Sequence, residues 1–303
     1  MRHLSIYRNI DAVAKAGSIR QAAELLAITP SALNRQILSL EEELGAPIFE
    51  RLPRGVRLSS SGELMLHHIR KQLSDFEKVQ SRIADLSGMR RGHVNIACSQ
   101  ALLPCFLPQQ IEIYRKTHPF VTFNIAMRDR DTVEQSLREY TVDIAMIFEP
   151  LPTTDCQTLQ VAEQRVHAIL ARDHPLAQRK SVKLEDCIAY PLAMPSHPKA
   201  GRLVIDKAAA KKGLELNPVI QSDSFEFLRH AVLNNQTIAF QFEIGLPPQD
   251  RNAPTVSVPL AEHDVPAGLL HLMQLSGRSL PVASARFANQ LQSSLADISV
   301  AIR

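Results

Sequence analysis

The sequence has few cysteines and no long apolar run, and both absences exclude classes of protein. Its 303 residues include four cysteines, Cys98, Cys105, Cys156 and Cys187. They form no Cys-x-x-Cys pair and have no histidine at zinc-finger spacing, so we expect buried structural thiols. No stretch approaches the roughly 20 apolar residues of a membrane helix, and the N-terminus lacks the apolar core of a signal peptide. We therefore expect a cytoplasmic protein.

Catalytic and metal-binding patterns are also missing. The 11 histidines include no His-x-x-x-His pair with a supporting acid, and the adjacent His67 and His68 point to different faces of a predicted helix. There is no Gly-x-Ser-x-Gly nucleophile motif and no glycine-rich phosphate-binding loop. The sequence thus predicts a protein that is not an enzyme and that uses no metal or other cofactor.

The net charge of the chain is small and unevenly distributed. It is +3 overall; residues 1–91 hold 14 Lys and Arg against 10 Asp and Glu, and residues 92–303 hold 20 against 21. This length and a hydrophobic content of 45% are enough for about two or three domains with ordinary cores. Because the positive excess is modest, binding to nucleic acid would depend on a few placed arginines and on two copies of a domain.

Residues 29–44 carry the signals of a helix with both ends defined. Thr29 suits the N-cap, Pro30 the first helical position, and Gly45 the left-handed stop. Spacings of four, three and four residues place one apolar stripe on this helix: Leu33, Ile37, Leu40 and Leu44. Three polar side chains of the first two turns fall on other faces and suit the edges of bases: Ser31, Asn34 and Arg35.

A second short helix precedes this one. Ser18 and Gln21 form a capping box at its start, and about three residues join the two helices. So short a turn predicts a helix-turn-helix, whose second helix lies in the DNA major groove. After Gly45, a two-stranded wing is predicted around the turn 52–55, with three arginines near the phosphates: Arg51, Arg54 and Arg57.

The run GSIRQAAELLAITPSALNRQILSLEEELGAPIFERLPRGVRLSSSGELML resembles, position by position, the DNA-binding end of the LysR-type transcriptional regulators. The resemblance implies a ligand-responsive regulator that binds operator DNA. Many members have Ser-Gln-Pro at the start of the recognition helix and Ser in place of Asn34, so the fold follows from the resemblance and the operator sequence does not. The expected DNA-binding residues are Ser18, Thr29, Ser31, Asn34, Arg35, Arg51 and Arg54.

A long helix over residues 59–87 follows the wing, capped by one of three consecutive serines. It carries a seven-residue a/d repeat: Leu66, Ile69, Leu73, Phe76, Gln80 and Ile83. One apolar stripe on an otherwise polar helix needs a partner. That partner is either the chain's own body or, as the resemblance implies, the same helix of a second copy in a dimer or tetramer. In the second case Gln80 helps to set the register, and the others are the dimerisation residues.

From residue 93 onward, short apolar strands alternate with helices, which predicts a largely parallel sheet covered by helices. Strands are expected at 93–98, 121–127, 142–148, 165–171, 189–194, 237–240, 256–260 and 268–273, and helices at 102–117, 132–140, 199–212, 222–233 and 280–298. The LysR resemblance extends over this part through weaker landmarks such as His174-Pro175-Leu176-Ala177. It implies two α/β subdomains like those of periplasmic binding proteins.

The expected domain organisation follows from these elements. A winged helix-turn-helix domain, all-α apart from its wing, occupies 1–58, the linker and dimerisation helix 59–87, and a hinge 88–92. Subdomain I comprises 93–161 and 266–303, and subdomain II comprises 162–265. The chain is expected to cross between them near Val161 and near Val265.

Ligands of open α/β sheets bind beyond the carboxyl ends of the strands, where helix N-termini present free N–H groups. The expected effector-binding residues are Ser99, Gln100, Arg128, Phe148, Ser196, His197 and Gln241. Ser99 is either a simple N-cap or an effector contact, and Arg128 and His197 are either ligands or solvated loop residues. With the resemblance, we expect a small anionic effector held by Ser99, with Arg128 or His197 adding charge.

Two other functions fit parts of the sequence. Some LysR-type relatives sense peroxide through a cysteine pair, which makes Cys187 and Cys156 candidates for a redox switch. An enzyme or solute-binding module fused to a DNA-binding head is the other alternative, and the missing catalytic motifs and signal peptide argue against it. The partners implied by the resemblance are operator DNA, a small-molecule effector, further copies of the chain and RNA polymerase, with no membrane.

Overall fold

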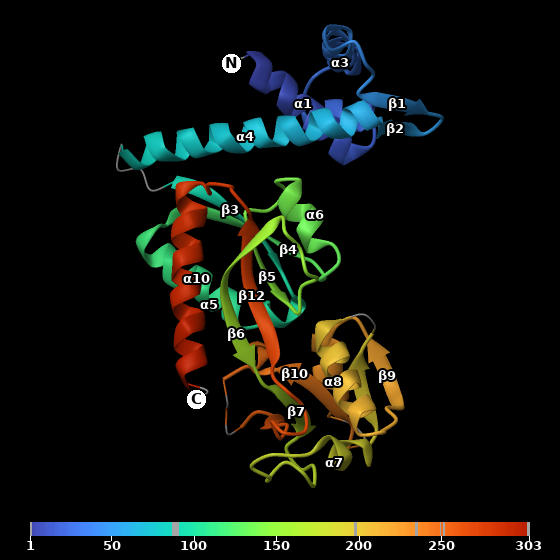
Figure 1. Cartoon of the computed structure of the whole chain (residues 1–303), viewed down its shortest axis with the longest axis vertical. Helices are drawn as coiled ribbons and strands as arrows, with labels where there is room; N and C mark the ends of the chain where they lie inside the picture. Colours follow the sequence, from blue (N-terminus) through green and yellow to red (C-terminus); the bar gives the residue numbers. More distant parts are fainter. Residues whose placement is uncertain are drawn as a thin grey trace. The chain divides into compact units, whose positions relative to one another are not determined.

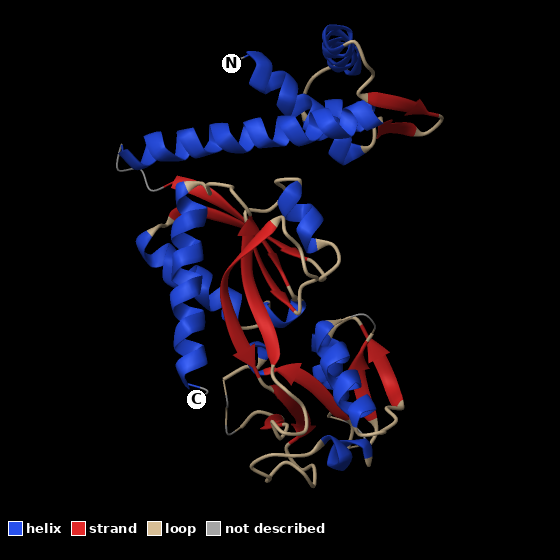
Figure 2. Ribbon diagram, in the orientation of Figure 1, coloured by secondary structure: helices blue, strands red, loops and turns tan. Residues whose placement is uncertain are grey.

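The computed structural model describes residues 2–86, 91–196, 199–233, 236–248, 250 and 252–301 of the chain. It divides into two compact units, one made of residues 1–89 with 138–140 and the other of residues 90–137 with 141–303. Figure 1 labels the elements along the chain, and Figure 2 distinguishes helices from strands. The first unit contains a winged helical domain and a long helix, and the second contains two five-stranded sheets.

The first unit is helical with a small wing. Its elements are α1 (Arg2–Ala16), α2 (Ile19–Leu25), α3 (Pro30–Leu44), β1 (Phe49–Leu52), β2 (Gly55–Leu58) and α4 (Ser60–Leu86). The strands pair antiparallel. The core takes one side of each helix and the start of the wing: Ile10, Val13, Ala22, Ala23, Leu33, Ile37, Ile48, Phe49, Leu66 and Ile69. Leu44, the last member of the stripe predicted for α3, is exposed, because this core does not extend to the last turn of the helix.

Local hydrogen bonds define the ends of α2 and α3. The Thr29 hydroxyl accepts from the N–H of Ala32 at 3.2 Å, and the Ser18 hydroxyl accepts from the N–H of Gln21 at 3.4 Å. Gly45 ends α3 with φ of 70°, in the left-handed region. Such caps satisfy backbone groups that a helix end leaves unpaired. The start of each helix is therefore defined by the hydroxyl of its N-cap residue, and the end of α3 by the backbone conformation of a glycine.

The wing is held against α3 and α4 by specific contacts. The Glu41 carboxylate on α3 accepts hydrogen bonds from the N–H groups of Ile48 (2.7 Å) and Phe49 (3.0 Å). A Cβ at Gly62 would lie 2.0 Å from the carbonyl oxygen of Ile48, so a residue with a side chain would displace the start of α4. The Ser59 hydroxyl accepts from the Gly62 N–H at 2.9 Å, which begins α4 at the first of the three candidate serines.

Subdomain I of the second unit is built on a sheet with strand order β4-β3-β5-β12-β6. Its elements are β3 (Arg91–Cys98), η1 (Gln100–Leu102), α5 (Phe106–Thr117), β4 (Phe120–Met127), α6 (Val133–Arg138), β5 (Ile144–Phe148), β6 (Cys156–Gln164), β12 (Gly268–Leu275) and α10 (Val282–Ala301). β3 pairs parallel with β4 and β5, and β12 pairs antiparallel with β5 and β6. α10 packs against β3, β6 and α5 (Figure 1).

Subdomain II has a second sheet with strand order β11-β7-β10-β8-β9 (Figure 2). Its elements are β7 (Val166–Ala171), α7 (Leu184–Ile188), β8 (Leu192–Pro195), α8 (Ala200–Lys211), β9 (Pro218–Ser222), α9 (Phe225–Ala231), β10 (Ile238–Phe242), η2 (Glu243–Gly245) and β11 (Thr255–Pro259). β8 pairs parallel with β9 and β10, and β7 pairs antiparallel with β10 and β11. Both subdomains contribute to one continuous apolar core.

The prediction of a largely parallel sheet was wrong, because each sheet is mixed. The antiparallel strands are those next to the two crossings between subdomains, where the chain leaves one sheet and returns to it. β6, β9 and α7 were not predicted at all. β6 is a polar strand at a sheet edge and β9 begins with Pro218, so neither carries the apolar alternation of a half-buried strand.

The crossings lie close to their expected positions. β6 remains paired with β12 as far as Gln164↔Gly268, so the boundary expected at Val161 falls inside β6 and the chain crosses at Arg165. The return expected near Val265 falls in the connection between β11 and β12. Of the expected hinge at 88–92, residues 88–90 lie outside the described residues, and Arg91 and Gly92 already belong to β3.

Candidate DNA-binding surface and effector cleft

The outer face of α3 presents polar and basic side chains. Ser31 and Arg35 are exposed on it. Thr29 and Ser18 use their hydroxyls as helix caps, and the Thr29 hydroxyl lies 3.2 Å from that of Ser31. Within the described part of the chain, the Arg35 guanidinium has no hydrogen bond or ion pair, so it is available to an outside group.

One side-chain hydrogen bond joins the wing to α3. Nη2 of Arg51 donates to Oδ1 of Asn34 at 2.7 Å. This bond occupies the acceptor of Asn34 and leaves its amide N–H groups for another partner. Arg57 pairs with Glu50 across the wing at 2.7 Å. Among the described residues Arg54 has no such partner, and its side chain is exposed at the turn of the wing.

The predicted dimerisation stripe on α4 divides into two parts. Leu66 and Ile69 are buried in the core of the first unit, so for them the alternative of packing on the chain's own body is the correct one. Leu73 packs partly on the same core. Phe76 is half-buried, and Ile83 is 58% exposed. The exposed apolar side chains of the last turns are Val79, Ile83 and Leu86.

The cleft between subdomains I and II brings several predicted effector residues together. Ser99, at the end of β3, accepts a hydrogen bond through its hydroxyl from the N–H of Phe148 at 3.2 Å. Oε1 of Gln100 accepts from the N–H of Phe225, in subdomain II, at 3.2 Å. Gln100 therefore connects the two subdomains, and the Ser99 hydroxyl aligns β3 with β5.

Two aromatic rings close this cleft. The rings of Phe148 and Phe242 are stacked, with centroids 3.9 Å apart and an interplanar angle of 7°. Gln241 is buried beside them, and its Oε1 accepts from the N–H of Phe242 at 3.0 Å. The cavity next to the stack has a volume of about 10 Å³, which is enough for one water molecule. A larger ligand would require the two rings to separate.

The charged groups at the cleft pair with neighbours. Arg128 donates to the hydroxyl of Ser136 (3.2 Å) and to the carbonyl oxygen of Met127 (2.8 Å), both in its own subdomain. Lys199 forms an ion pair with Asp129 at 2.7 Å that connects subdomain II to subdomain I. Only 14% of the Lys199 side chain is exposed. Among the described residues the cation that bridges the cleft is thus Lys199, whereas the sequence predicted Arg128 or His197.

The remaining predicted residues contribute less. Ser196 directly follows β8 and donates its N–H to the carbonyl of Ser222 at 3.1 Å, and His197 lies outside the described residues. Gln164, at the crossing, is fully buried and accepts from the N–H of Ile244 at 3.0 Å. Sequence analysis missed Gln164 because β6 shows no strand pattern. It missed Lys199 because burial of a lysine leaves no local signal.

The four cysteines are free thiols. Burial raises the pKa of Cys98 and of Cys187 to about 12, and it also raises the pKa of Cys105. A raised pKa keeps a thiol protonated, whereas a reactive cysteine needs a lowered one. Cys156 lies on β6 in subdomain I and Cys187 on α7 in subdomain II, so the two redox candidates are on different subdomains.

The described residues offer neither a metal site nor a membrane-spanning helix. Among them, no group of three or more His, Cys, Asp and Glu side chains could hold a metal ion. None of the described helices combines the length and the apolar character that crossing a membrane requires. The functional candidates are therefore the face formed by α3 and the wing, and the cleft between the subdomains.

Comparison with known proteins gives matches over nearly the whole chain. Residues 4–63 match the bacterial regulatory helix-turn-helix protein, lysR family, and residues 87–296 match the LysR substrate binding domain. The HTH-type transcriptional activator CmpR of Synechocystis sp. is 24% identical over 243 residues, which cover 80% of each chain. A probable RuBisCO transcriptional regulator of the same organism is 28% identical over 239 residues, covering 77% of this chain and 69% of that protein.

Solved structures show the same fold. A full-length variant of OxyR from Pseudomonas aeruginosa superposes with a TM-score of 0.72 at 20% identity, covering 96% of this chain and 94% of that one. Full-length CbnR, solved in complex with its target DNA, superposes with a TM-score of 0.65 at 17% identity, covering 96% of this chain and 99% of that one. At these identities the likeness concerns the fold alone.

The helix-turn-helix with its wing, joined to an α/β substrate-binding domain, defines a DNA-binding transcriptional regulator. The chain belongs to the LysR family of these regulators, and the resemblance found in its DNA-binding run is confirmed. Its relatives are named transcriptional regulators or activators and not enzymes, as the missing catalytic motifs predicted.

The buried thiols lead to a prediction that tests the redox alternative. At pH 8 a thiol with a pKa of about 12 is a thiolate in about one molecule in ten thousand. Ellman's reagent should therefore label Cys98 and Cys187 only as the chain unfolds, and label Cys105 and Cys156 earlier. Rapid oxidation of Cys187 by peroxide in the folded protein, with a change in DNA affinity, would establish a redox sensor instead.

Proposed function

We propose that α3 and the wing bind operator DNA as a single surface, with Arg35 and Ser31 at base edges and Arg54 at a phosphate. The observation that supports this most directly is the hydrogen bond between Arg51 and Asn34. It fixes the position of the wing relative to α3 and leaves the guanidinium groups of Arg35 and Arg54 for DNA. In this proposal Ser18 and Thr29 hold the helix starts, and Asn34 offers its remaining N–H groups.

We infer that the last turns of α4 pair with the same segment of a second copy. A two-fold axis can place two recognition helices in successive major grooves on one side of DNA. The stripe formed by Phe76, Val79, Ile83 and Leu86 has spacings of three, four and three residues, as in a coiled coil. Because Leu66 and Ile69 belong to the domain core, the proposed seam is shorter than the predicted one. Further association to a tetramer would use other surfaces.

We propose that a small organic anion controls the protein by entering between subdomains I and II. Entry would separate the rings of Phe148 and Phe242, and the acid group would replace Asp129 as the partner of Lys199. The Ser99 hydroxyl, now bonded to the N–H of Phe148, would supply a second contact. The Asp129–Lys199 pair joins the two subdomains, so replacing Asp129 by the ligand would remove one contact between them. A ligand shifts such an equilibrium only by its difference in affinity for the two states.

Removal of Arg35 and removal of Arg54 should affect DNA binding in different ways. Arg35→Ala should cost about 1–3 kcal/mol on a selected operator and relax the choice of base at one position. Arg54→Ala should weaken all sequences alike and lower the slope of log affinity against log salt by about one. Fluorescence anisotropy over a range of salt measures both effects. Arg115→Ala, on an exposed residue of α5, is the charge-matched control, and an Arg35→Ala protein with parental affinity and specificity would remove Arg35 from the interface.

Charge placed in the exposed part of the α4 stripe should separate the dimer. Ile83→Glu puts two carboxylates against each other across the proposed two-fold axis and should raise the dimer dissociation constant at least about tenfold. Sedimentation velocity measures it, with Lys71→Glu as a control on an exposed position of α4 outside the stripe. If Ile83→Glu remains folded and as dimeric as the parent, the main dimer contact lies elsewhere.

Two substitutions at the cleft should change effector affinity in opposite directions. Asp129→Asn frees Lys199, so an organic acid that raises the melting temperature should bind this variant roughly 3- to 10-fold more tightly, about the free energy of one partly exposed ion pair. Lys199→Gln should abolish the stabilisation. Asp131→Asn, which removes an exposed carboxylate from the same loop, should change nothing. A screen of carboxylic acids against their neutral amides by thermal shift on the full chain checks this, and stabilisation only by neutral compounds would refute the anion site.

A further inference from the structure

A second cavity lies within subdomain II and involves neither ring of the Phe148–Phe242 stack. Its volume is about 730 Å³, within the range of about 300–1,000 Å³ that small-molecule sites occupy. The sheet edge formed by β11 and β7 lines it, together with the end of α9, residues between 172 and 180, and residues 246–248, 250, 253 and 254. We call it the β11 groove. It has far more room for a ligand than the cavity of about 10 Å³ beside the aromatic stack.

The floor of the β11 groove is apolar. Ile169 on β7 is buried beneath it, and Leu246 is half-buried along it. Leu233, at the end of α9, is 41% exposed at its side. An apolar surface of this kind binds a hydrocarbon or aromatic body by removing it from water. The floor alone does not select a class of ligand.

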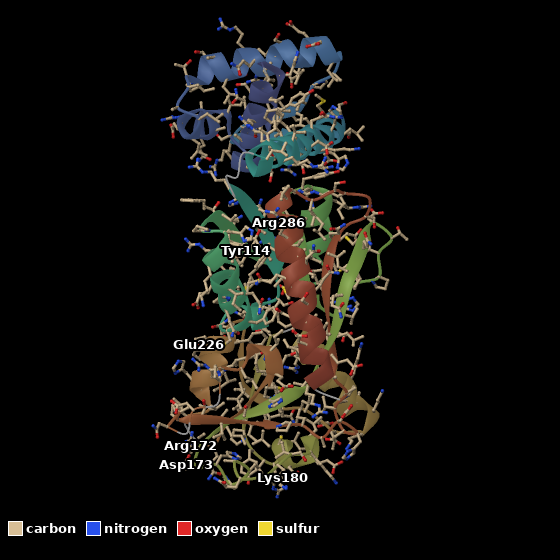
Figure 3. The ribbon with its side chains drawn as sticks, turned by 90° about the vertical axis from the view of Figure 1, so that its left-hand side faces the viewer. Tyr114, Arg172, Asp173, Lys180, Glu226 and Arg286 are labelled. Atoms are coloured by element: carbon tan, nitrogen blue, oxygen red, sulfur yellow. The ribbon has the colours of Figure 1, made fainter. Side chains whose placement is uncertain are left out.

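The rim of the groove is strongly basic. Among the described residues that line it, four are Lys or Arg and one, Asp250, is acidic; the basic ones are Arg172, Arg179, Lys180 and Arg229. By contrast, residues 92–303 as a whole hold 20 basic and 21 acidic side chains. Arg172 and Lys180 lie at the same end of subdomain II in Figure 3. Positive charge is thus concentrated at this cavity on a domain that is otherwise nearly neutral, which favours an anionic ligand.

Two of these cations are not neutralised by a carboxylate. Arg179 pairs with Asp186 and Arg229 with Glu226. The Arg172 guanidinium donates to two backbone carbonyls, those of Ala253 (2.7 Å) and Asp250 (2.8 Å), and so keeps its full charge while holding the loop at the groove. Lys180 is exposed and has no hydrogen bond or ion pair within the described ranges.

The edge of β11 adds hydrogen-bond donors. Pro254 and Leu260 bond to β7 at the two ends of the pairing, so in this antiparallel register the even-numbered residues between them face β7. Thr255 and Ser257 therefore point their N–H groups away from β7. No other described strand pairs with this edge, and an isolated bridge from Val182 occupies only its far end, at Leu260. These N–H groups and hydroxyls lie beside two cations that no carboxylate neutralises. Together they are the partners that a carboxylate, sulfonate or phosphate needs.

We propose that the β11 groove binds an organic anion with an apolar body, as a second ligand site separate from the effector cleft. The apolar body lies on Ile169 and Leu246, and the acid group meets Lys180, Arg172 and the edge of β11. This site does not depend on the cleft proposal. Leu246, which lines the groove, follows Phe242 of the closed stack by four residues through η2, so the two sites share one stretch of backbone.

Titration of the full chain with 2-naphthoate tests the site, because this probe combines an aromatic body with one carboxylate. By calorimetry it should bind saturably, and its neutral amide and acetate should each bind at least about tenfold more weakly. Lys180→Glu reverses a rim charge, and Ser257→Phe fills the groove without altering charge. Each should weaken 2-naphthoate at least about tenfold. Circular dichroism and retained operator binding verify that both variants fold.

Two controls separate this site from the rest of the protein. Lys207→Glu reverses the charge of an exposed lysine on α8 outside the groove, and Ser99→Ala alters the effector cleft. Both should leave 2-naphthoate affinity unchanged. Loss of binding in Ser99→Ala, with parental affinity in Lys180→Glu and Ser257→Phe, would move the ligand to the cleft and overturn the proposal. Absence of saturable binding up to about 5 mM 2-naphthoate would overturn it as well.

Discussion

The antiparallel pairing of β6 with β12 is the interaction on which the substrate-binding domain depends. β6 carries the chain out of subdomain I and β12 brings it back, so the two connections between the subdomains are hydrogen-bonded to each other up to Gln164↔Gly268. A single covalent connection would leave the subdomains free to rotate, whereas two paired strands restrict them to bending about the crossing. Any response to a ligand in the cleft has to act through this bend.

The aromatic stack lies next to the same crossing. Phe148 is opposite Leu270 of β12, and Phe242 ends β10, which pairs with β7 immediately after the crossing. A Cβ at Gly268 would lie 2.4 Å from the Phe242 ring. The ring therefore fits only because the first residue of β12 has no side chain. The stack and the ion pair of Asp129 with Lys199 thus connect the subdomains at separate points. Opening the cleft would break both contacts, so the proposed effector would act on two of them.

The DNA-binding unit shows how one sequence pattern can serve two kinds of packing. The a/d repeat of α4 begins with Leu66 and Ile69 inside the domain core and ends with Ile83 exposed to solvent. The first part joins the helix to the helix-turn-helix, and the second part carries the seam proposed for a second copy. A movement of α4 would consequently be transmitted to α3, because both helices contribute to the same core.

The sequence by itself determined the features that depend on neighbouring residues. The caps at Ser18 and Thr29, the glycine stop after α3, the wing and the family all follow from side chains a few residues apart or from a continuous motif. Strands with apolar runs were found in the same way. Polar edge strands such as β6 were not, since their hydrogen-bond partners are distant in the chain.

Only the tertiary structure decided the contents of the cleft. Ser99, Gln100 and Phe148 were predicted because a strand end is a local feature, but their partners were not. The Asp129–Lys199 pair joins residues 70 positions apart. The ring of Phe148 stacks on that of Phe242, and no sequence periodicity links these two residues. Helix caps and alternation are governed by backbone geometry within one turn or strand. Ion pairs and ring stacks across a cleft depend on how two sheets meet, which no local pattern encodes.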